Sequence, residues 1–439
     1  MDKYKEYKDV SMGWLGRIPA HWTTVPLKYS IGKSPFSFVD GDWIESKVIE
    51  SEGIRYLTTG NVGVINYKEQ GNGFISDKTF RELNCTEVFP GDVLISRLNF
   101  PIGRSCIVPD LGYRIVVAVD NVIFRPDETK YNKKYLVYQM NCYPYSENAN
   151  FIARGSTMQR ITRTQLGALK LCVPPLEEQN AMVGFLDKKC SEIDNVISAQ
   201  QKRIALLQEL KQSVITHAVT KGLNPNLEMK DSGVEWIGEV PKHWEVAPIK
   251  RYANIFTGNT PSTKEERYYD SEDINWFTPG DFYKDTLIES NKKISEISRK
   301  ENACRIFPPK SVYMIGIGGT IGKIATCEEE ASANQQINII VPNTYTDYKY
   351  LAYCMRCQKE EIILSANVVT LPIINQDKTG YLFMPHPQKT EQTSIVNYLD
   401  KKCASIDSTI SKAQHQVELL QEYKQSLITE VVTGKRKVS

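Results

Sequence analysis

The sequence has little net charge and no long hydrophobic run. Its 54 basic and 52 acidic residues leave a formal charge of +2, which argues against a protein that coats nucleic acid mainly by electrostatic attraction. A near-neutral total still permits a basic face that is offset by an acidic one elsewhere. No apolar stretch reaches the length of about 18 residues that a membrane span needs, and the N-terminus is charged rather than apolar. We therefore expect a cytoplasmic protein without a membrane partner.

Metal ligands are also scarce. The five histidines are scattered, and the ten cysteines do not form two ligand pairs. Cys354 and Cys357 form a single C-x-x-C motif, whereas a structural zinc site needs a second pair nearby. Without a secretion signal, the thiols are expected to be reduced and mostly buried. We predict no metal and no cofactor in this chain.

Motifs of catalytic sites are incomplete. Residues 316–323 are rich in glycine, but a phosphate-binding loop needs glycine where Ile317 stands and Ser or Thr where Ile324 stands. A tight hairpin is the alternative interpretation. Residues 126–130 contain the acids and the lysine of a metal-dependent nuclease on one turn, where two carboxylates cannot converge on one metal. No Asn/Asp-Pro-Pro-aromatic stretch of the amino-methyltransferases occurs, and no Ser-His-Asp set can be assembled. The sequence therefore predicts that this chain performs no covalent chemistry.

A long internal repeat is the main feature that is present. Residues 186–194 and 399–407 both begin with Leu-Asp-Lys-Lys-Cys, and their offset is 213 residues, the difference between 399 and 186. A second pair of segments, residues 14–22 and 236–244, shares its Trp, Gly, Pro and His-Trp positions at an offset of 222 residues. The second copy is therefore nine residues shorter between the two motifs, as expected for related domains with different loops.

Two segments of about 150 residues lie between the repeated motifs. They alternate short β-branched and aromatic runs with Gly, Pro, Asn and Asp, which predicts strands and hairpins. The stretches that begin at Tyr135 and Tyr350 lack such breakers and predict helices, so each segment is expected to be an α+β domain. His21 and His243 have no acidic partner at a fixed spacing, so packing or capping is expected of them rather than catalysis.

Each segment is followed by a predicted long helix. Residues 176–218 contain one glycine and no proline, and apolar residues recur there every seven positions. A helix of about 45 residues would be about 65 Å long and could not bury its apolar stripe alone, so the second copy is the expected partner. Lysine interrupts the same seam position in both copies, at Lys211 and Lys424. The seam comprises Leu186, Cys190, Ile193, Ile197, Gln200, Ile204, Leu207, Lys211, Val214 and Ala218 in the first copy, and Leu399, Cys403, Ile406, Ile410, Ala413, Val417, Leu420, Lys424, Leu427 and Val431 in the second.

The order domain, helix, domain, helix predicts the architecture. We expect an α+β protein in which two globular domains are separated by two long α-helices that form an antiparallel, pseudo-twofold symmetric coiled coil. The predicted segments are a first domain over 1–173, a first helix over 174–222, a second domain over 223–386, and a second helix over 387–434 with a basic tail to 439.

These motifs resemble a known family, the specificity (S) subunits of type I restriction-modification systems. The resemblance covers essentially the whole chain, and all but one of its motifs occur twice. Residues 385–392 depart from the pattern, because they lack the double proline that precedes the first helix. The motifs are Trp236-Ile237-Gly238-Glu239-Val240-Pro241-Lys242-His243-Trp244, Pro174-Pro175-Leu176-Glu177-Glu178-Gln179, the Leu-Asp-Lys-Lys segments, and Lys221-Gly222-Leu223-Asn224-Pro225.

The resemblance implies a non-catalytic, DNA-binding subunit. Each globular domain would be a target recognition domain that reads one half of a bipartite sequence in double-stranded DNA. The helices would set the spacer between the halves and dock two modification (M) subunits. The M subunits would carry S-adenosylmethionine and methylate adenine, while restriction (R) subunits would translocate and cleave DNA.

Candidate DNA-binding residues follow from the chemistry of base edges and phosphates, which favours Arg, Lys, Asn, Gln, Ser and Thr. Half-sites on one face of DNA lie roughly 34–36 Å apart, which helices of about 65 Å can support if the domains lean inward. Residues 334–336 would equally suit the closing of a turn before the apolar run 337–341. The candidates are Thr59, Asn61, Arg97, Arg104, Gln159, Arg160 and Arg163 in the first domain, and Asp281, Lys323, Asn334, Gln335 and Gln336 in the second.

Two alternatives come from other functional classes. The chain could be a coiled-coil adaptor without DNA specificity, which a gel shift with duplex DNA would distinguish. The less favoured alternative is a self-contained nuclease or methyltransferase, which would modify DNA as the purified chain alone.

Overall fold

The computed structural model divides into two compact units. Unit 1 is Met1–Gln201 with His415–Ser439, and unit 2 is Lys202–Gln414. Each unit combines one globular domain with a part of each of two long helices. The structure describes residues 3–155, 158–368 and 372–438.

The two long helices predicted by the heptad pattern are present. Helix α5 spans Leu176–Lys221 (46 residues) and α10 spans Lys389–Val432 (44 residues). Both helices are followed within two residues by a glycine with positive φ, Gly222 at +75° and Gly434 at +72°. Glycine adopts this left-handed conformation without strain and therefore terminates a helix readily.

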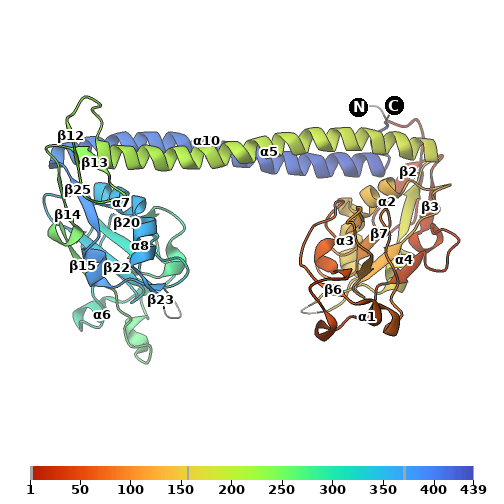
Figure 1. Cartoon of the computed structure of the whole chain (residues 1–439), viewed down its shortest axis with the longest axis horizontal. Coiled ribbons are helices and arrows are strands. Elements are labelled where there is room, and N and C mark those ends of the chain that lie inside the picture. Colours follow the sequence, from red (N-terminus) through yellow and green to blue (C-terminus); the bar gives the residue numbers. More distant parts are fainter. Residues whose placement is uncertain (1–2, 156–157, 369–371, 439) are drawn as a thin grey trace. The chain divides into compact units, whose positions relative to one another are not determined.

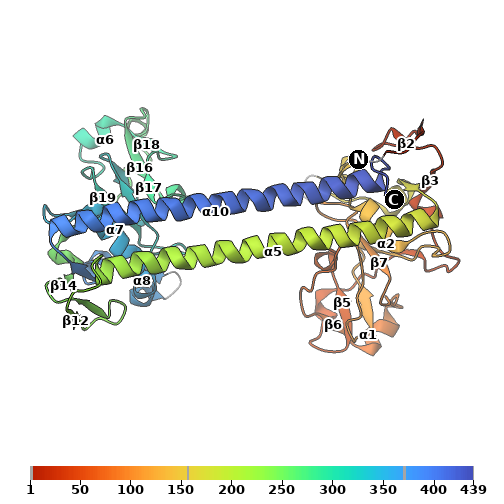
Figure 2. The same ribbon diagram turned by 90° about the horizontal axis from the view of Figure 1, so that it is seen from above.

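Within each unit the parts of α5 and α10 lie side by side and antiparallel (Figures 1 and 2). In unit 1, Lys424 Nζ pairs with Asp194 Oδ1 at 2.6 Å. In unit 2, Lys211 Nζ pairs with Asp407 Oδ2 at 2.8 Å. The two residue numbers add to 618 in both pairs, so the helices have the same antiparallel register in both units.

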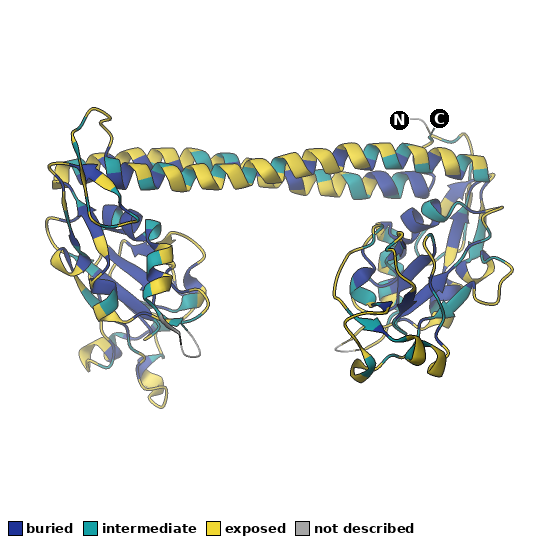
Figure 3. Cartoon of the chain, viewed as in Figure 1, coloured by how far each residue is buried: buried dark blue, intermediate teal, exposed yellow. Residues whose placement is uncertain are grey.

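The residues of the predicted seam are buried or half-buried, and the outward face of the helix pair is exposed (Figure 3). Leu186, Ile193 and Leu427 belong to the hydrophobic core of unit 1. The two seam lysines are only partly exposed, with side-chain exposures of 24% for Lys211 and 21% for Lys424. The lysine that interrupts the apolar seam in each helix therefore forms an ion pair with an aspartate of the opposite helix.

The globular domain of unit 1 contains two larger sheets and two two-stranded ones, β1-β2 and β11-β3. The four-stranded sheet is antiparallel in the order β4-β10-β7-β8, and the three-stranded sheet has the order β6-β5-β9 with β5 and β9 parallel. Helix α2 packs on β8 and α3 (Figure 1). The strands are β1 Tyr7–Asp9, β2 Arg17–Pro19, β3 Thr23–Pro26, β4 Phe38–Asp40, β5 Ile54–Leu57, β6 Phe74–Ile75, β7 Val93–Ser96, β8 Ser105–Ile107, β9 Ile115–Val117, β10 Asn121–Phe124 and β11 Lys170–Val173, and the helices are α1 Asp77–Glu82, α2 Lys133–Met140, α3 Tyr143–Ile152 and α4 Arg163–Ala168.

The globular domain of unit 2 repeats this plan with a larger sheet. Its five-stranded sheet has the order β15-β22-β19-β20-β17, and its three-stranded sheet has the order β18-β16-β21. Helix α7 packs on β19, β20 and β22. The strands are β12 Met229–Asp231, β13 Glu239–Pro241, β14 Glu245–Pro248, β15 Ala253–Thr257, β16 Ile274–Phe277, β17 Thr286–Leu287, β18 Lys293–Ile294, β19 Ser311–Ile315, β20 Ile324–Cys327, β21 Ser332–Ala333, β22 Ile337–Pro342, β23 Asn367–Val368, β24 Pro372–Ile373 and β25 Phe383–His386, and the helices are α6 Glu296–Lys300, α7 Tyr348–Cys357, α8 Lys359–Ser365 and α9 Gln376–Gly380.

Several local predictions are confirmed. The stretches at Tyr135 and Tyr350 form helices α2 and α7. The glycine-rich residues 316–323 connect the antiparallel strands β19 and β20, and Gly322 N donates to Ile315 O at 2.9 Å, so this stretch is a hairpin rather than a phosphate loop. The cysteines are free thiols, and all of them are buried except Cys357, which is half-buried.

Candidate functional site

The aspartate of the repeated Leu-Asp-Lys-Lys segment anchors each globular domain to a long helix. In unit 1, Asp187 of α5 accepts hydrogen bonds from Tyr138 Oη and Lys134 Nζ of α2, both at 2.7 Å. Burial raises the pKa of Tyr138, and its hydrogen bond to Asp187 raises this pKa further. The phenol therefore stays protonated and remains a donor, which holds α2 against α5.

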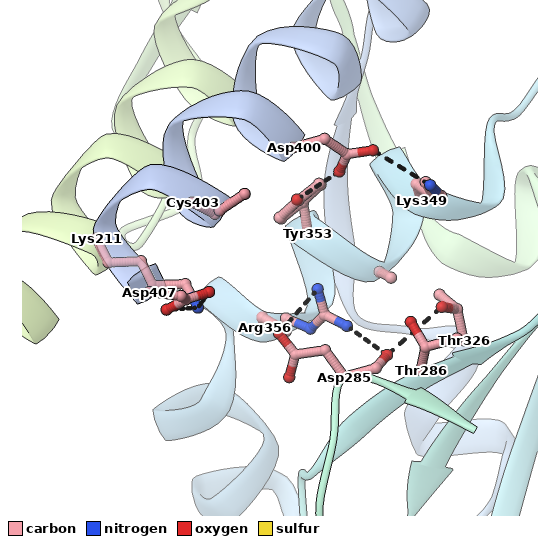
Figure 4. Close-up of a pocket in the computed structure, with 12 residues that line it drawn as sticks. Lys211, Asp285, Thr286, Thr326, Lys349, Tyr353, Arg356, Asp400, Cys403 and Asp407 are labelled. Carbon is pink, nitrogen blue, oxygen red and sulfur yellow. Dashed lines mark hydrogen bonds and ion pairs between the residues drawn. The ribbon is translucent and has the colours of Figure 1, made fainter. Parts of the chain in front are cut away.

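Unit 2 repeats the anchor with Asp400 of α10 (Figure 4). Asp400 accepts from Tyr353 Oη at 2.7 Å and from Lys349 Nζ at 3.2 Å. The adjoining cleft, of about 270 Å³, is lined by three basic side chains and three aspartates. Because these charges balance, the cleft favours neither an anion nor a cation. The charged lining residues are Lys211, Lys349, Arg356, Asp285, Asp400 and Asp407.

A glutamate in the first turn of each long helix binds the repeated His-Trp motif. Glu178 Oε2 lies 2.9 Å from His21 Nε2, and both carboxylate oxygens lie 3.3 Å from Trp22 Nε1. Tyr4 donates its hydroxyl to the same carboxylate. Burial is the main reason that the pKa of Tyr4 is raised. This cluster fixes the first strands of unit 1 on the start of α5.

Unit 2 forms a similar cluster, in which the glutamate at the start of α10 contacts the histidine and the tryptophan of the second His-Trp motif. Glu391 Oε2 lies 3.0 Å from His243 Nε2 and 3.1 Å from Trp244 Nε1. Both histidines thus have an acidic partner, which the sequence pattern did not reveal because the partners are 157 and 148 residues away. The sequence feature that could have indicated these partners is the repeated Glu-Gln pair, Glu178-Gln179 in the first copy and Glu391-Gln392 in the second.

The neighbouring glutamine is also a structural residue that the sequence analysis missed. Gln179 is fully buried, and its Oε1 accepts from the backbone of Asn132, the residue that caps α2, at 2.8 Å. Gln392 is equally buried, and its Oε1 accepts from the backbone of Asp347, the cap of α7, at 2.7 Å. The repeated Glu-Gln pair therefore orients both the first strands and the anchoring helix of each domain.

Among the candidate DNA-binding residues, Arg97 lies inside the first domain. It is 5% exposed, and its Nε lies 3.1 Å from Asp40 Oδ1. Its guanidinium also donates to the carbonyl groups of Ile161 and Val119, at 3.3 and 2.6 Å. Burial lowers the pKa of Arg97. Its donors hold together the loops on which the other candidates lie.

Arg104, the last residue of the loop between β7 and β8, holds this loop together through its guanidinium. Its guanidinium reaches five backbone carbonyl groups, and burial lowers its pKa. With its donors directed at carbonyl groups of its own domain, Arg104 shapes this loop from within. The carbonyl groups belong to Thr59, Val62, Leu98, Asn99 and Pro101, at 2.7 to 3.2 Å.

Asn61 and Asp281 occupy equivalent turns after β5 and β16. Asn61 is 1% exposed, and its Oδ1 accepts from Thr58 N at 2.9 Å. Asp281 is 3% exposed, and its Oδ2 accepts from Thr278 N at 2.7 Å. Both side chains therefore close a short helical turn. Thr59 lies within the first of these turns and is half-buried.

Gln159, Arg160 and Arg163 are exposed and lie beside the β7–β8 loop. Arg160 Nη2 pairs with Asp120 at 2.7 Å, and Arg163 Nε lies 3.6 Å from Asp40. The structure thus brings together six candidates of the first domain, whereas the Asn61 side chain bonds only within its own turn and the loop that follows. The six are Arg97, Arg104, Gln159, Arg160, Arg163 and Thr59, whose carbonyl oxygen accepts from Arg104 Nη2 at 2.8 Å.

In the second domain the candidates divide into turn-closing and exposed residues. Asn334 is buried, its Oδ1 accepts from Gln336 N at 3.0 Å, and its Nδ2 donates to Gln336 Oε1 at 3.0 Å. Of the two interpretations of this segment, the turn is confirmed for this pair. Gln335 and Lys323 are exposed, and Lys323 Nζ donates to the carbonyl of Phe282, the residue after Asp281, at 3.3 Å.

Neither a metal cluster nor a membrane-spanning helix is found among residues 3–155, 158–368 and 372–438. No group of three or more His, Cys, Asp or Glu side chains in these ranges could hold a metal ion. No helix there is long and apolar enough to cross a membrane.

Comparison with known proteins identifies similar sequences. The family described as type I restriction modification DNA specificity domain matches residues 41–206 and 241–419. The chain is 24% identical over 380 residues to the putative type I restriction enzyme MjaX specificity subunit of Methanocaldococcus jannaschii, covering 83% of each chain. It is 22% identical over 449 residues to the MjaIX specificity subunit of the same organism, covering 99% of this chain and 97% of the other.

Solved structures show a similar fold. A chain of a type I R-M system, solved to explain complex assembly and conformational transition, has a TM-score of 0.71 at 15% identity and covers 95% of this chain and 99% of that one. The HsdS subunit from Thermoanaerobacter tengcongensis has a TM-score of 0.51 at 14% identity, with 95% and 98% covered.

Proposed function

Because the chain belongs to the family of type I restriction-modification specificity subunits, we propose that it gives such a complex a bipartite DNA site. The segment 1–173 reads one half-site in double-stranded DNA, and the segment 223–386 reads the other. The long helices set the distance between the half-sites. The chain holds no cofactor and performs no covalent chemistry itself.

One observation carries this proposal: the two units share a scaffold but differ at the loops between paired strands. Both units use the same anchor, with Asp187 in one and Asp400 in the other, and the same helix register. At the loop, Arg104 reaches five carbonyl groups, whereas its counterpart Lys323 reaches one. Equal scaffolds with unlike loops suit two unlike half-sites at a fixed separation.

The exposed candidates are the ones we expect to contact DNA directly. Arg160 and Arg163 have side-chain exposures of 45% and 44%, and their ion pairs to half-buried carboxylates can exchange for phosphate or guanine contacts. Gln159, Lys323 and Gln335 are also exposed. The buried candidates, such as Arg97 and Asn61, support the loops that present these side chains.

We propose that the helices bind two copies of one partner, the modification subunit. Leu206 and Leu210 of α5 are 64% and 50% exposed, and Leu419 and Tyr423 of α10 are 48% and 51% exposed. Residues four apart share one helix face, and the second pair lies 213 residues after the first, as the repeat predicts. A duplicated apolar pair suits a partner in two copies, which would bring S-adenosylmethionine and adenine methylation; restriction subunits would complete the complex.

The test is an exchange of residues 28–172 for the corresponding segment of another specificity subunit. Sequencing the methylated sites of a host that contains this chain and its modification partner should show one altered half-site and one unchanged half-site. Loss of both half-sites in a complex that still assembles would contradict the assignment of one half-site to each globular domain. Assembly with the partner but no site preference would favour the adaptor function.

The role of the helices is tested by removing one heptad within residues 186–218. We expect a changed spacer or loss of assembly, with the sequence of each half-site unchanged. An altered half-site sequence would contradict the role of the helices in spacing. Modification of DNA by the purified chain alone would favour the nuclease or methyltransferase alternative.

A further inference from the structure

The loop between β7 and β8 in unit 1 carries an aromatic side chain in solvent. Phe100 is 69% exposed, and it stacks on none of the other aromatic rings that the structure describes. A single exposed hydrophobic residue is ordinary on a protein surface. The loop that carries Phe100, however, is held by hydrogen bonds on both sides of the ring.

The backbone on both sides of Phe100 is held in place. Arg104 Nη1 lies 2.9 Å from the carbonyl oxygen of Asn99. Asn99 N donates to Gln159 O at 3.1 Å, and Ile102 N donates to a side-chain oxygen of α3 at 2.9 Å. The ring is therefore presented by a preorganised loop, which lowers the entropy cost of inserting it into a partner.

Positive charge surrounds this loop. Arg154 and Arg160 are exposed, and their backbones pair with each other directly beside Asn99 and Gln159. With three further arginines, one exposed and two turned into the domain, the cluster has five positive charges, and its ion pairs use two carboxylates, so its net charge is +3. A surplus of arginine around an apolar ring is complementary to a polyanion with apolar stacking faces, which describes duplex DNA. The further arginines are Arg97, Arg104 and Arg163, and the carboxylates are Asp40 and Asp120.

The equivalent loop of unit 2 lacks the aromatic ring. Gly318 (φ +104°) is followed by a second glycine and a threonine. Gly318 N donates to Pro372 O at 3.1 Å, as Asn99 N does to Gln159 O in unit 1. The two loops are therefore built at the same place in each domain, but only the first presents a large apolar side chain.

We propose that Phe100 inserts between two stacked base pairs in the half-site read by the first domain and kinks the DNA there. This inference rests on the proposed function. Apolar side chains that enter a base step unstack it partly, and the bent duplex gains contacts to the surrounding cations. The second domain binds its half-site without insertion. The two half-sites thus differ in deformability as well as in sequence, and the first favours a flexible pyrimidine–purine step at the point of insertion.

The experiment uses the full chain in complex with its modification subunit, and a duplex with the methylome-mapped site that contains 2-aminopurine at successive positions. Fluorescence should rise on binding at one step of the first half-site and at no step of the second. Phe100→Ala should abolish this rise and weaken binding about tenfold to a hundredfold, as expected for losing one base–aromatic stacking contact. Phe100→Trp should preserve the rise.

The control is Tyr113→Ala, which removes a ring that is 56% exposed in the loop after β8, at the other end of that strand. This variant should keep the affinity and the fluorescence of the unmodified complex. Full affinity of Phe100→Ala would overturn the proposal, and so would failure of that variant to bind the modification subunit, because the ring would then contact protein. A complex that binds DNA without site preference would contradict the proposed function instead.

Discussion

Lys424 Nζ lies 2.6 Å from Asp194 Oδ1, so a charged pair occupies a seam position that the heptad pattern otherwise reserves for apolar residues. The lysine side chain is 21% exposed and the aspartate side chain is 51% exposed. A pair with this much solvent contact stabilises a protein by about 0–1 kcal/mol. A polar residue within an apolar seam is better suited to selecting one register than to adding stability.

Replacing Lys424 with leucine should therefore stabilise the helix pair. Leucine buries more apolar surface at this position, for a gain of about 1–2 kcal/mol, while Asp194 stays solvated. Differential scanning calorimetry should show a higher unfolding temperature. Lys188→Leu, at an exposed position of α5, should leave it unchanged. A lower unfolding temperature for Lys424→Leu would show that the ion pair contributes more than its exposure suggests.

Replacing Asp187 with alanine should loosen the first domain from α5. The change removes the acceptor of Tyr138 and Lys134, and the exposures of 36% for Asp187 and 43% for Lys134 limit the loss to about 1–2 kcal/mol. Hydrogen exchange should accelerate in α2 but not in α7, which Asp400 anchors separately. Equal acceleration in both helices would contradict the local nature of the anchor. Asp187→Asn should have a smaller effect, because the amide oxygen still accepts from Tyr138.

Comparing Asn61→Ala with a variant of an exposed candidate should distinguish residues that stabilise the domain from residues that contact DNA. The amide is 1% exposed and bonds the backbone of Thr58, Lys68 and Gln70, so its loss leaves partly buried backbone groups unpaired at a cost of about 1–3 kcal/mol. Urea unfolding should detect this loss. Gln335→Ala, at an exposed position, should change the free energy of unfolding by less than about 0.5 kcal/mol but weaken binding to the second half-site. Equal stability of both variants would contradict this division.

Thiol reactivity should report the packing of the domains. Burial raises the pKa of Cys106 and Cys142 to about 12, and it raises the pKa of half-buried Cys357 as well. Thiolate is therefore scarce at pH 7. Native titration with Ellman's reagent should release at most one equivalent quickly, from Cys357, and ten equivalents in denaturant. Fast release of several equivalents under native conditions would show that a domain opens readily.

Features set by local pattern could be predicted from the sequence. The heptad repeat predicted the seam of α5 and α10, because burial of one helix stripe recurs every seven residues. Breaker-free stretches predicted α2 and α7, and the departures from the phosphate-loop spacing at Ile317 and Ile324 predicted a hairpin. The family resemblance contributed the DNA-reading function, which no local pattern contains.

Features that depend on contacts between distant residues could not be predicted. The partner of His21 is Glu178, and no spacing rule connects residues so far apart. Arg97 and Arg104 have the chemistry of DNA-binding side chains, but whether a loop arginine faces solvent or its own backbone depends on the fold of that loop. For the same reason the sequence did not indicate a role for Phe100, since the exposure of its ring and the hydrogen bonds of its loop depend on the folded structure.

The shared register of the helix pair has a genetic consequence. Lys211 follows Asp194 by seventeen positions along α5, and Lys424 follows Asp407 by seventeen positions along α10. An in-frame insertion or deletion confined to one of these intervals displaces one of the two ion pairs, whereas the same event in both intervals preserves them. A gene of this kind is thus expected to change helix length in matched steps, most simply by gene conversion, in which one repeat is copied onto the other.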